Sequence, residues 1–83
     1  MTTNNLVASI LNNILQSKSH KILDYDEKIF EKGLIDSYGI VELVIELEKT
    51  FNIKIPYESM LIQNFSSVNE ISKFIKQLKS QEL

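Results

Sequence analysis

Apolar residues recur every three or four positions in three separate stretches of this chain. In residues 6–15 they form one stripe, and the polar Ser9, Asn12 and Asn13 lie on the opposite side. Spacing of this kind places side chains on one face of an α-helix. It predicts a first helix from about Thr3 to Ser17, with an apolar stripe made of Leu6, Val7, Ile10, Leu11, Ile14 and Leu15.

The second stretch has the clearest helical period. Its apolar residues stand at positions i, i+3, i+4, i+7 and i+11, namely Ile40, Leu43, Val44, Leu47 and Phe51. The third stretch opens with Ser67 and Glu70 at the spacing of a capping box, in which each side chain bonds the other residue's backbone N–H. The predicted inner stripe of this last helix consists of Val68, Ile71, Phe74, Ile75 and Leu78.

The segments between these helices are less regular. Residues 18–36 predict a long loop that is held to the core by Ile22, Leu23, Ile29 and Phe30. Pro56 prevents a continuous helix after the second stretch, because proline has no N–H to donate, but a short helix can follow it. The pattern predicts an all-α fold in a single domain spanning residues 1–83. It is a small four-helix bundle of three main helices and one short helix, with a long first loop.

The composition narrows the possible functions. A chain of 83 residues builds one modest core and leaves little room for a deep substrate cleft. It has no Cys, no Trp and one His, which is a thin set of groups for catalysis, so we expect a protein that is not an enzyme. His20 is predicted to pair with Asp24 or Asp26, and no second His or Cys joins it to form a metal site.

Net charge and hydropathy argue against nucleic acid and membranes as partners. The net charge of -2 and the pI near 5.3 provide no basic surface for nucleic acid. The N-terminal residues lack the basic region of a secretion signal, and no apolar run approaches about 18 residues. We expect a cytoplasmic monomer that neither binds nucleic acid nor inserts into a membrane. Lys73, Lys76 and Lys79 are interpreted as solvated lysines that complement the dipole of the last helix.

Ser37 stands at the entrance of the second predicted helix, directly after Asp36. Either residue can cap the helix, because a serine or aspartate oxygen accepts a hydrogen bond from a first-turn N–H. Two adjacent capping residues are redundant, and the apolar, flexible approach formed by Gly33, Leu34 and Ile35 can hold Ser37 at the surface. A helix N-terminus also favours a phosphate, so Ser37 is a candidate attachment position as well as a candidate cap.

The run GLIDSYGIVELVIELEKTFNIKIP resembles the phosphopantetheine attachment region of acyl carrier proteins. The resemblance covers about residues 30–56 and joins, at the family's spacing, Gly33, the Asp36-Ser37 pair, Val41-Glu42-Leu43, Phe51 and Ile55-Pro56. It implies that a phosphopantetheinyl transferase moves 4'-phosphopantetheine from coenzyme A onto Ser37, while Asp36 helps the transferase and its metal engage the site. The thiol of this arm would then carry acyl or aminoacyl groups as thioesters, loaded by other enzymes.

Some positions depart from the pattern of fatty-acid carriers. Tyr38 stands where many of them have leucine, Gly39 stands where they have a polar residue, and the chain is less acidic. The run FEKGLIDS is closer to carriers that serve D-alanine, aminoacyl or specialised acyl pathways. The stiff, branched side chains of Ile40, Val44 and Ile55 also predict that a long acyl chain finds no ready-made cavity.

The outward side of the second helix is the predicted docking face. It combines apolar side chains with carboxylates, which suits brief docking to basic-rimmed enzymes, and its residues are Tyr38, Val41, Glu42, Ile45 and Glu48. The expected partners are the phosphopantetheinyl transferase, an acyl- or aminoacyl-loading synthetase, and downstream acyl-transfer enzymes of a specialised biosynthetic pathway. The alternative is an unmodified helical interaction module in which Ser37 is only a helix cap.

Overall fold

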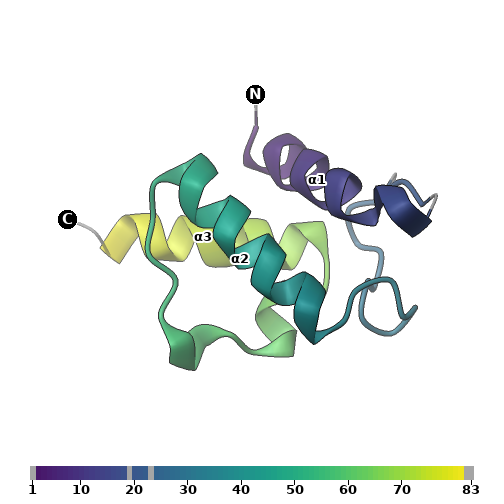
Figure 1. The fold of residues 1–83 in the computed structure, drawn as a ribbon. Helices are drawn as coiled ribbons and strands as arrows, with labels where there is room; N and C mark the ends of the chain where they lie inside the picture. The colour runs from purple at the N-terminus through teal and green to yellow at the C-terminus, as the bar shows by residue number, and fades with distance from the viewer. Residues whose placement is uncertain (1, 19, 23, 82–83) are drawn as a thin grey trace.

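The computed structural model describes residues 2–18, 20–22 and 24–81. Within these ranges every regular element is helical and no strand occurs, which confirms the prediction of an all-α fold. Three α-helices form the body of the molecule (Figure 1): α1 (Thr3–Ile14), α2 (Ser37–Phe51) and α3 (Val68–Gln81). Three short 3-10 helices accompany them: η1 (Leu15–Lys18), η2 (Tyr57–Ser59) and η3 (Ile62–Phe65).

Helix α1 begins where the sequence predicts and ends at Ile14, earlier than predicted. The Thr2 hydroxyl caps its N-terminus by accepting a hydrogen bond of 3.1 Å from the Asn5 N–H. From Leu15 the backbone tightens into η1, which is a common way for an α-helix to end. The apolar stripe faces inward as predicted, with Val7, Ile10, Leu11 and Leu15 buried and Leu6 and Ile14 packed against the core.

The short fourth helix is not confirmed as an α-helix. Between Pro56 and Ser66 the chain forms η2 and η3, which are 3-10 helices of three and four residues. The backbone at Leu61 is extended, with φ −101° and ψ 142°, so the helical conformation is interrupted between them. Pro56 stands at the N-cap of η2 with φ −62°, in keeping with the preference of proline for the entrance of a helical turn.

Hydrogen bonds hold the long first loop against the end of η3 and the start of α3. The Ile29 N–H donates to the Ser66 carbonyl at 3.0 Å, and the Asn69 N–H donates to the Tyr25 carbonyl at 3.0 Å. The Asn69 side-chain amide also donates to the Asp26 carboxylate at 2.6 Å. The loop that leads to Ser37 is therefore fixed by contacts with a helix that lies far along the sequence.

The predicted contacts within this loop are confirmed in part. Ile22 and Ile29 are buried, Phe30 is half-buried against the core, and Leu23 lies outside the described residues. The predicted pairing of His20 with Asp24 or Asp26 is wrong, because His20 Nε2 lies 2.8 Å from Glu27 Oε2. Both aspartates have other partners: Asp24 Oδ1 accepts the Asp26 N–H at 2.9 Å, and Asp26 bonds the side chain of Asn69 in α3.

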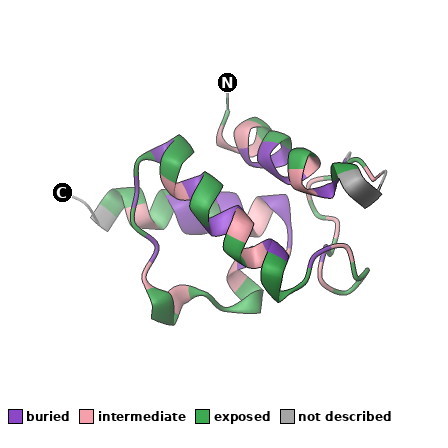
Figure 2. Ribbon diagram, viewed as in Figure 1, coloured by how far each residue is buried: buried purple, intermediate pink, exposed green. Residues whose placement is uncertain are grey.

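The core lies where the three α-helices meet. Helix α1 packs against both α2 and α3, and the buried residues lie along the facing sides of the helices (Figure 2). The rings of Phe65 and Phe74 meet edge to face with their centroids 5.5 Å apart. None of the helices in the described ranges is long and apolar enough to cross a membrane. The fully buried side chains include Leu11, Leu15, Ile29, Leu43, Leu47, Phe65, Ile71 and Ile75.

Hydrogen bonds fix both ends of α3. Ser67 Oγ accepts the Glu70 N–H at 3.2 Å, which is one half of the predicted capping box. The Glu70 carboxylate lies 3.7 Å from Lys73 Nζ instead, and the reciprocal bond to Ser67 is not formed among the described residues. At the other end, Lys79 Nζ donates to the Phe51 carbonyl at 3.1 Å. Lys79 is therefore more than a solvated lysine, since it ties the end of α3 to the end of α2.

Candidate functional site

The start of α2 separates the roles of Asp36 and Ser37. Asp36 is the N-cap residue, with an extended backbone, and its Oδ1 accepts the Gly39 N–H at 2.9 Å. Ser37 is the first residue of the helix, its side chain is exposed, and its hydroxyl makes no hydrogen bond within the described part of the chain. The cap is thus provided by Asp36, and the Ser37 hydroxyl is exposed and unbonded within the described residues.

A tight turn leads into this position. Gly33 has φ +68°, a left-handed conformation that glycine adopts without strain. The Gly33 N–H donates to the Phe30 carbonyl at 3.0 Å, and the Leu34 N–H donates to the Ile29 carbonyl at 2.9 Å. The approach to Ser37, which the sequence suggested to be flexible, is therefore an ordered turn.

Close packing behind Ser37 explains the glycine that departs from fatty-acid carriers. Ile35 is buried and lies against the first turn of α2. A Cβ atom added at Gly39 would lie 2.5 Å from Ile35 Cγ1 and 3.2 Å from Ile35 Cδ1. Gly39 therefore allows the Leu34-Ile35 segment to close against the helix, and this contact directs the following residues, including Ser37, toward the surface.

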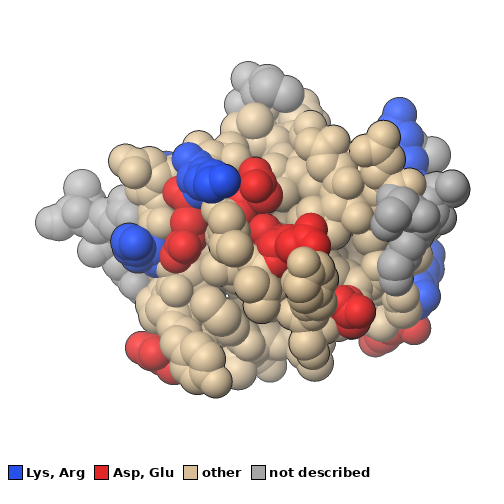
Figure 3. Space-filling view, in the orientation of Figure 1, with Lys and Arg blue, Asp and Glu red and all other residues tan. Residues whose placement is uncertain are grey.

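The outward side of α2 carries the apolar residues that the sequence placed there. Tyr38, Val41 and Ile45 are 73%, 54% and 46% exposed. Acidic side chains gather over the same helix, with lysines at one edge of the group (Figure 3). Glu42 is half-buried and lies on the side of α2 that faces α1. The exposure of the three apolar side chains is confirmed, and the role of this face in docking stays a prediction.

Glu48, the remaining predicted docking residue, has a structural partner. Its Oε2 accepts the Ile55 N–H at 2.8 Å, in the segment that returns from α2 toward η2. Ile55 is buried, so this carboxylate satisfies a backbone donor at the edge of the core. Replacing Glu48 would therefore disturb the fold, and Glu42 is the better position at which to test docking.

A second group of exposed apolar side chains was missed by the sequence analysis. It covers η2, η3 and the residues between them, and consists of Tyr57, Met60, Leu61 and Ile62. These residues have no helical period, because two short turns replace a regular helix. The sequence does contain a signal for this group, which is the run of Met60, Leu61 and Ile62 a few residues after Pro56. Three consecutive apolar residues in a short turn cannot all face the core, so at least one of them is expected to be exposed.

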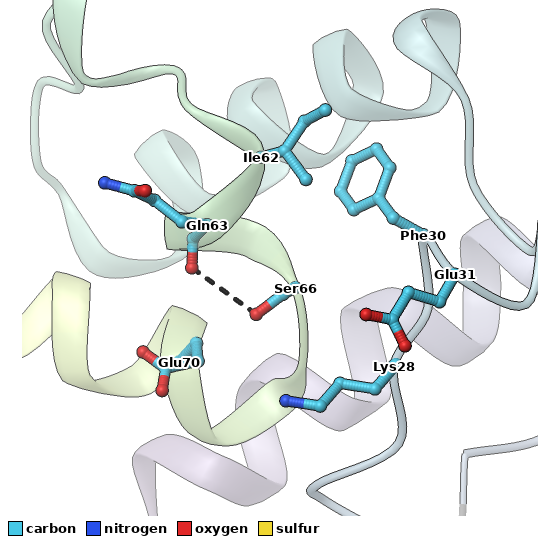
Figure 4. Close-up of a pocket in the computed structure, with 7 residues that line it drawn as sticks. All are labelled: Lys28, Phe30, Glu31, Ile62, Gln63, Ser66 and Glu70. Atoms are coloured by element: carbon cyan, nitrogen blue, oxygen red, sulfur yellow. Dashed lines mark hydrogen bonds between the residues drawn. The ribbon is translucent and has the colours of Figure 1, made fainter.

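A further pocket lies between the first loop and η3 (Figure 4). Its volume is about 560 Å³, and Phe30 and Ile62 face each other at one end. The other end is polar and of mixed charge, and the complete lining is Lys28, Phe30, Glu31, Ile62, Gln63, Ser66 and Glu70. No group of three or more His, Cys, Asp or Glu side chains in the described ranges is arranged to hold a metal ion.

Comparison with known proteins shows which protein family has this site. Residues 5–75 match the family model described as "phosphopantetheine attachment site". The chain belongs to this family of carrier proteins. It is similar to the D-alanyl carrier protein of Streptococcus uberis, with 40% identity over 66% of this chain and 70% of the relative. It is also similar to the D-alanyl carrier protein of Streptococcus pyogenes serotype M5, with 41% identity over 65% of this chain and 68% of the relative.

A carrier protein of this family bears a covalent 4'-phosphopantetheine group and does not itself catalyse a reaction. When attached, the group supplies the thiol that this cysteine-free chain lacks. The start of α2 fits such a group. Ser37 offers an exposed hydroxyl, the helix N-terminus favours the negative charge of a phosphodiester, and a pocket of about 230 Å³ that includes Asp36 and Tyr38 in its lining opens beside it.

Proposed function

We propose that this carrier protein holds an aminoacyl group, and D-alanine in the first instance, as a thioester on a 4'-phosphopantetheine arm attached to Ser37. The observation that carries the proposal is the start of α2, where Asp36 caps the helix and leaves the Ser37 hydroxyl exposed and unbonded. In an unmodified interaction module Ser37 would serve as the cap, and Asp36 already fills that role. The D-alanyl carrier proteins of the two streptococci support the choice of cargo.

The residues around Ser37 would serve the attachment in distinct ways. Asp36 places a carboxylate next to the hydroxyl, where it can help a phosphopantetheinyl transferase and its metal ion engage the site. The positive end of the α2 dipole stabilises the phosphodiester. Tyr38, Val41 and Ile45 offer a small apolar contact, and Glu42 adds charge that steers a basic-rimmed partner. The proposed partners are this transferase, an aminoacyl-loading synthetase and a downstream acyl-transfer enzyme of a specialised pathway.

Intact mass spectrometry tests the attachment position. After co-expression with a phosphopantetheinyl transferase, the chain should gain the mass of one 4'-phosphopantetheine group. Ser37→Ala should abolish the gain and leave the helical content intact, because Asp36 still caps α2. Ser9→Ala, at an exposed serine of α1, is the matched control and should gain the full mass. A Ser37→Ala protein that still acquires the arm would show that the attachment residue is another one.

The same measurement then tests the cargo. The arm-bearing chain is incubated with ATP, a D-alanine-activating ligase and D-alanine, and in parallel reactions with a fatty-acid-activating ligase and octanoate. We expect the mass of one alanyl group in the first reaction and slow or no loading in the second. Efficient loading with octanoate and none with D-alanine would refute the aminoacyl assignment while leaving the attachment position in place.

A further inference from the structure

A groove runs along the side of α2 that faces α1, and it begins next to Ser37. It consists of two adjoining hollows of about 230 and 280 Å³, and Ile14 and Glu42 line both of them. The first hollow reaches the residues that flank Ser37, and the second continues toward the middle of α1. We call this the α1–α2 groove, and its lining is Ile10, Asn13, Ile14, Leu15, Leu34, Ile35, Asp36, Tyr38, Gly39, Glu42 and Glu46.

Apolar and polar side chains both line the α1–α2 groove, and its charged groups are all negative. Ionisable carboxylates line it at three positions, and no lysine is part of the lining. Two of the three carboxylates have partners, since Asp36 Oδ1 bonds the Gly39 N–H at 2.9 Å and Glu46 Oε1 lies 3.9 Å from Lys49 Nζ. Glu42 is half-buried and has no hydrogen bond or ion pair within the described ranges. It is the carboxylate that can accept a new cationic partner.

Glu42 lies within reach of a group attached to Ser37. The two residues are five positions apart on α2, which corresponds to a rise of about 7.5 Å along the helix axis and a turn of about 140° around it, so the arm has to bend around the helix. A phosphopantetheine arm is a chain of more than ten single and amide bonds, so its extended length exceeds this rise. Tyr38 and Gly39 line the hollow between the two positions, so the path from Ser37 to Glu42 follows the groove.

We propose, on the basis of the aminoacyl function proposed above, that the α1–α2 groove receives the end of the loaded arm and that Glu42 holds the ammonium of the aminoacyl group. Ile10 and Ile14 provide the apolar surface for the small side chain. A fatty acyl group has no ammonium and gains no ionic contact there. The larger pocket of Figure 4 is less suitable, because Lys28 lies in its lining beside Glu31 and Glu70 and opposes a cation.

The test compares two arms that differ only in the amino group. A transferase attaches non-hydrolysable D-alanyl and propionyl analogues of the arm to the uniformly 15N-labelled chain, and backbone amide spectra are recorded for both. Signals that differ between the two forms should cluster at Ile14, Gly39, Glu42 and Glu46. The titration midpoint of the alanyl amine should fall by about 0.2 to 0.7 pH unit in Glu42→Gln, which is the size expected of an exposed ion pair.

Glu31→Gln is the matched control. It removes the same charge from an exposed glutamate in the pocket of Figure 4, and it should leave the titration midpoint unchanged. Equal midpoints in the native chain and in Glu42→Gln would overturn the proposal, as would differences between the two arms that cluster at Phe30, Ile62 and Glu70. Circular dichroism of each variant verifies that α2 remains folded.

These outcomes are independent of those that test the proposed function. The transferase installs the analogue directly, so the groove is probed whether or not a D-alanine ligase loads this chain. A failure to attach either analogue would refute the proposed function, because it would show that the chain does not accept the arm. A failure of ligase loading with a positive groove result would place a different aminoacyl group on the same site.

Discussion

Gly39 shows how closely single residues are fitted at the start of α2. Glycine in a helix interior costs about 1 kcal/mol relative to alanine. An alanine here would place its Cβ 2.5 Å from Ile35 Cγ1, so Ile35 would have to leave a position in which it is 6% exposed. Burying an isoleucine side chain is worth about 1.5–3 kcal/mol, more than the helix propensity gained. The glycine is therefore the favourable choice at this position.

Ser72 is a buried polar residue for which the fold provides no partner. It is 3% exposed in the middle of α3, and its hydroxyl makes no hydrogen bond within the described ranges. Alanine would remove the unsatisfied group and has the higher helix propensity. We expect Ser72→Ala to raise the free energy of unfolding by about 1 kcal/mol, and the Tm by about 4–8 °C.

Ser80→Ala is the control for this prediction. Ser80 lies on the same helix and is exposed, so its substitution reports the propensity gain alone and should have a smaller effect. Thermal and urea unfolding of both variants give the comparison. A loss of stability in Ser72→Ala would mean that the Ser72 hydroxyl does have a partner, such as the carbonyl four residues earlier in α3.

At the scale of the element, α2 presents four sides with different tasks. One side is buried in the core through Leu43, Leu47 and the rest of its apolar stripe. The opposite side exposes the apolar residues proposed for docking. Between them, Glu42 faces the α1–α2 groove, and Glu48 faces the returning segment, where it bonds Ile55. The four sides follow from the period of the helix, which turns each successive residue by about 100°.

The Glu48 contact leads to a stability prediction. Glu48→Ala leaves the N–H of a buried residue without its acceptor, so the free energy of unfolding should fall by about 1–3 kcal/mol. Glu48→Gln keeps an acceptor oxygen and should lose less than half of that amount. Glu46→Ala, on the same helix with only a 3.9 Å contact to Lys49, is the control and should stay within about 0.5 kcal/mol of the native chain. A Glu48→Ala protein as stable as this control would contradict the structural role.

At the scale of the whole molecule, the close packing of the three helices leaves little space in the core for a long acyl chain. Large side chains from every α-helix and from η3 are fully buried against one another, among them Leu11, Leu47, Phe65 and Ile75. The pockets next to the start of α2 and below the first loop are open to the surface. A long acyl chain would have to separate packed helices, and close-packed interiors resist such expansion.

A series of acyl groups on the arm tests this limit. Each fully buried methylene would add about 0.8 kcal/mol, which corresponds to about 3–6 °C in Tm for a domain of this size. We expect the acetyl and octanoyl forms to differ in Tm by less than about 3 °C, measured by differential scanning calorimetry against the unloaded arm. A Tm that climbs steadily with chain length would show that the core opens for the chain and would favour a fatty-acyl carrier.

The sequence by itself determined the three main helices, their inner faces and the candidate attachment serine. These features rest on local rules: the 3.6-residue period of apolar positions, and the capping-type residues at the helix starts, which are the Asp36-Ser37 pair and Ser67. The exposure of Val41 and Ile45 follows from the same period, because they fall off the buried stripe. Helices and their caps depend on residues that are close together in the sequence, so they can be predicted without knowledge of tertiary contacts.

The tertiary structure decided the features for which the sequence offers several hydrogen-bond partners of nearly equal energy. Asp36 or Ser37 could each cap α2, and His20 had three carboxylates within a few residues, of which Glu27 is the observed partner. The roles of Glu48 and Lys79, the two 3-10 turns after Pro56 and the α1–α2 groove likewise could not be predicted from the sequence. Hydrogen bonds of this kind are worth about 0.5–1.5 kcal/mol each, so the partner is set by which segments the packed core brings within bonding distance.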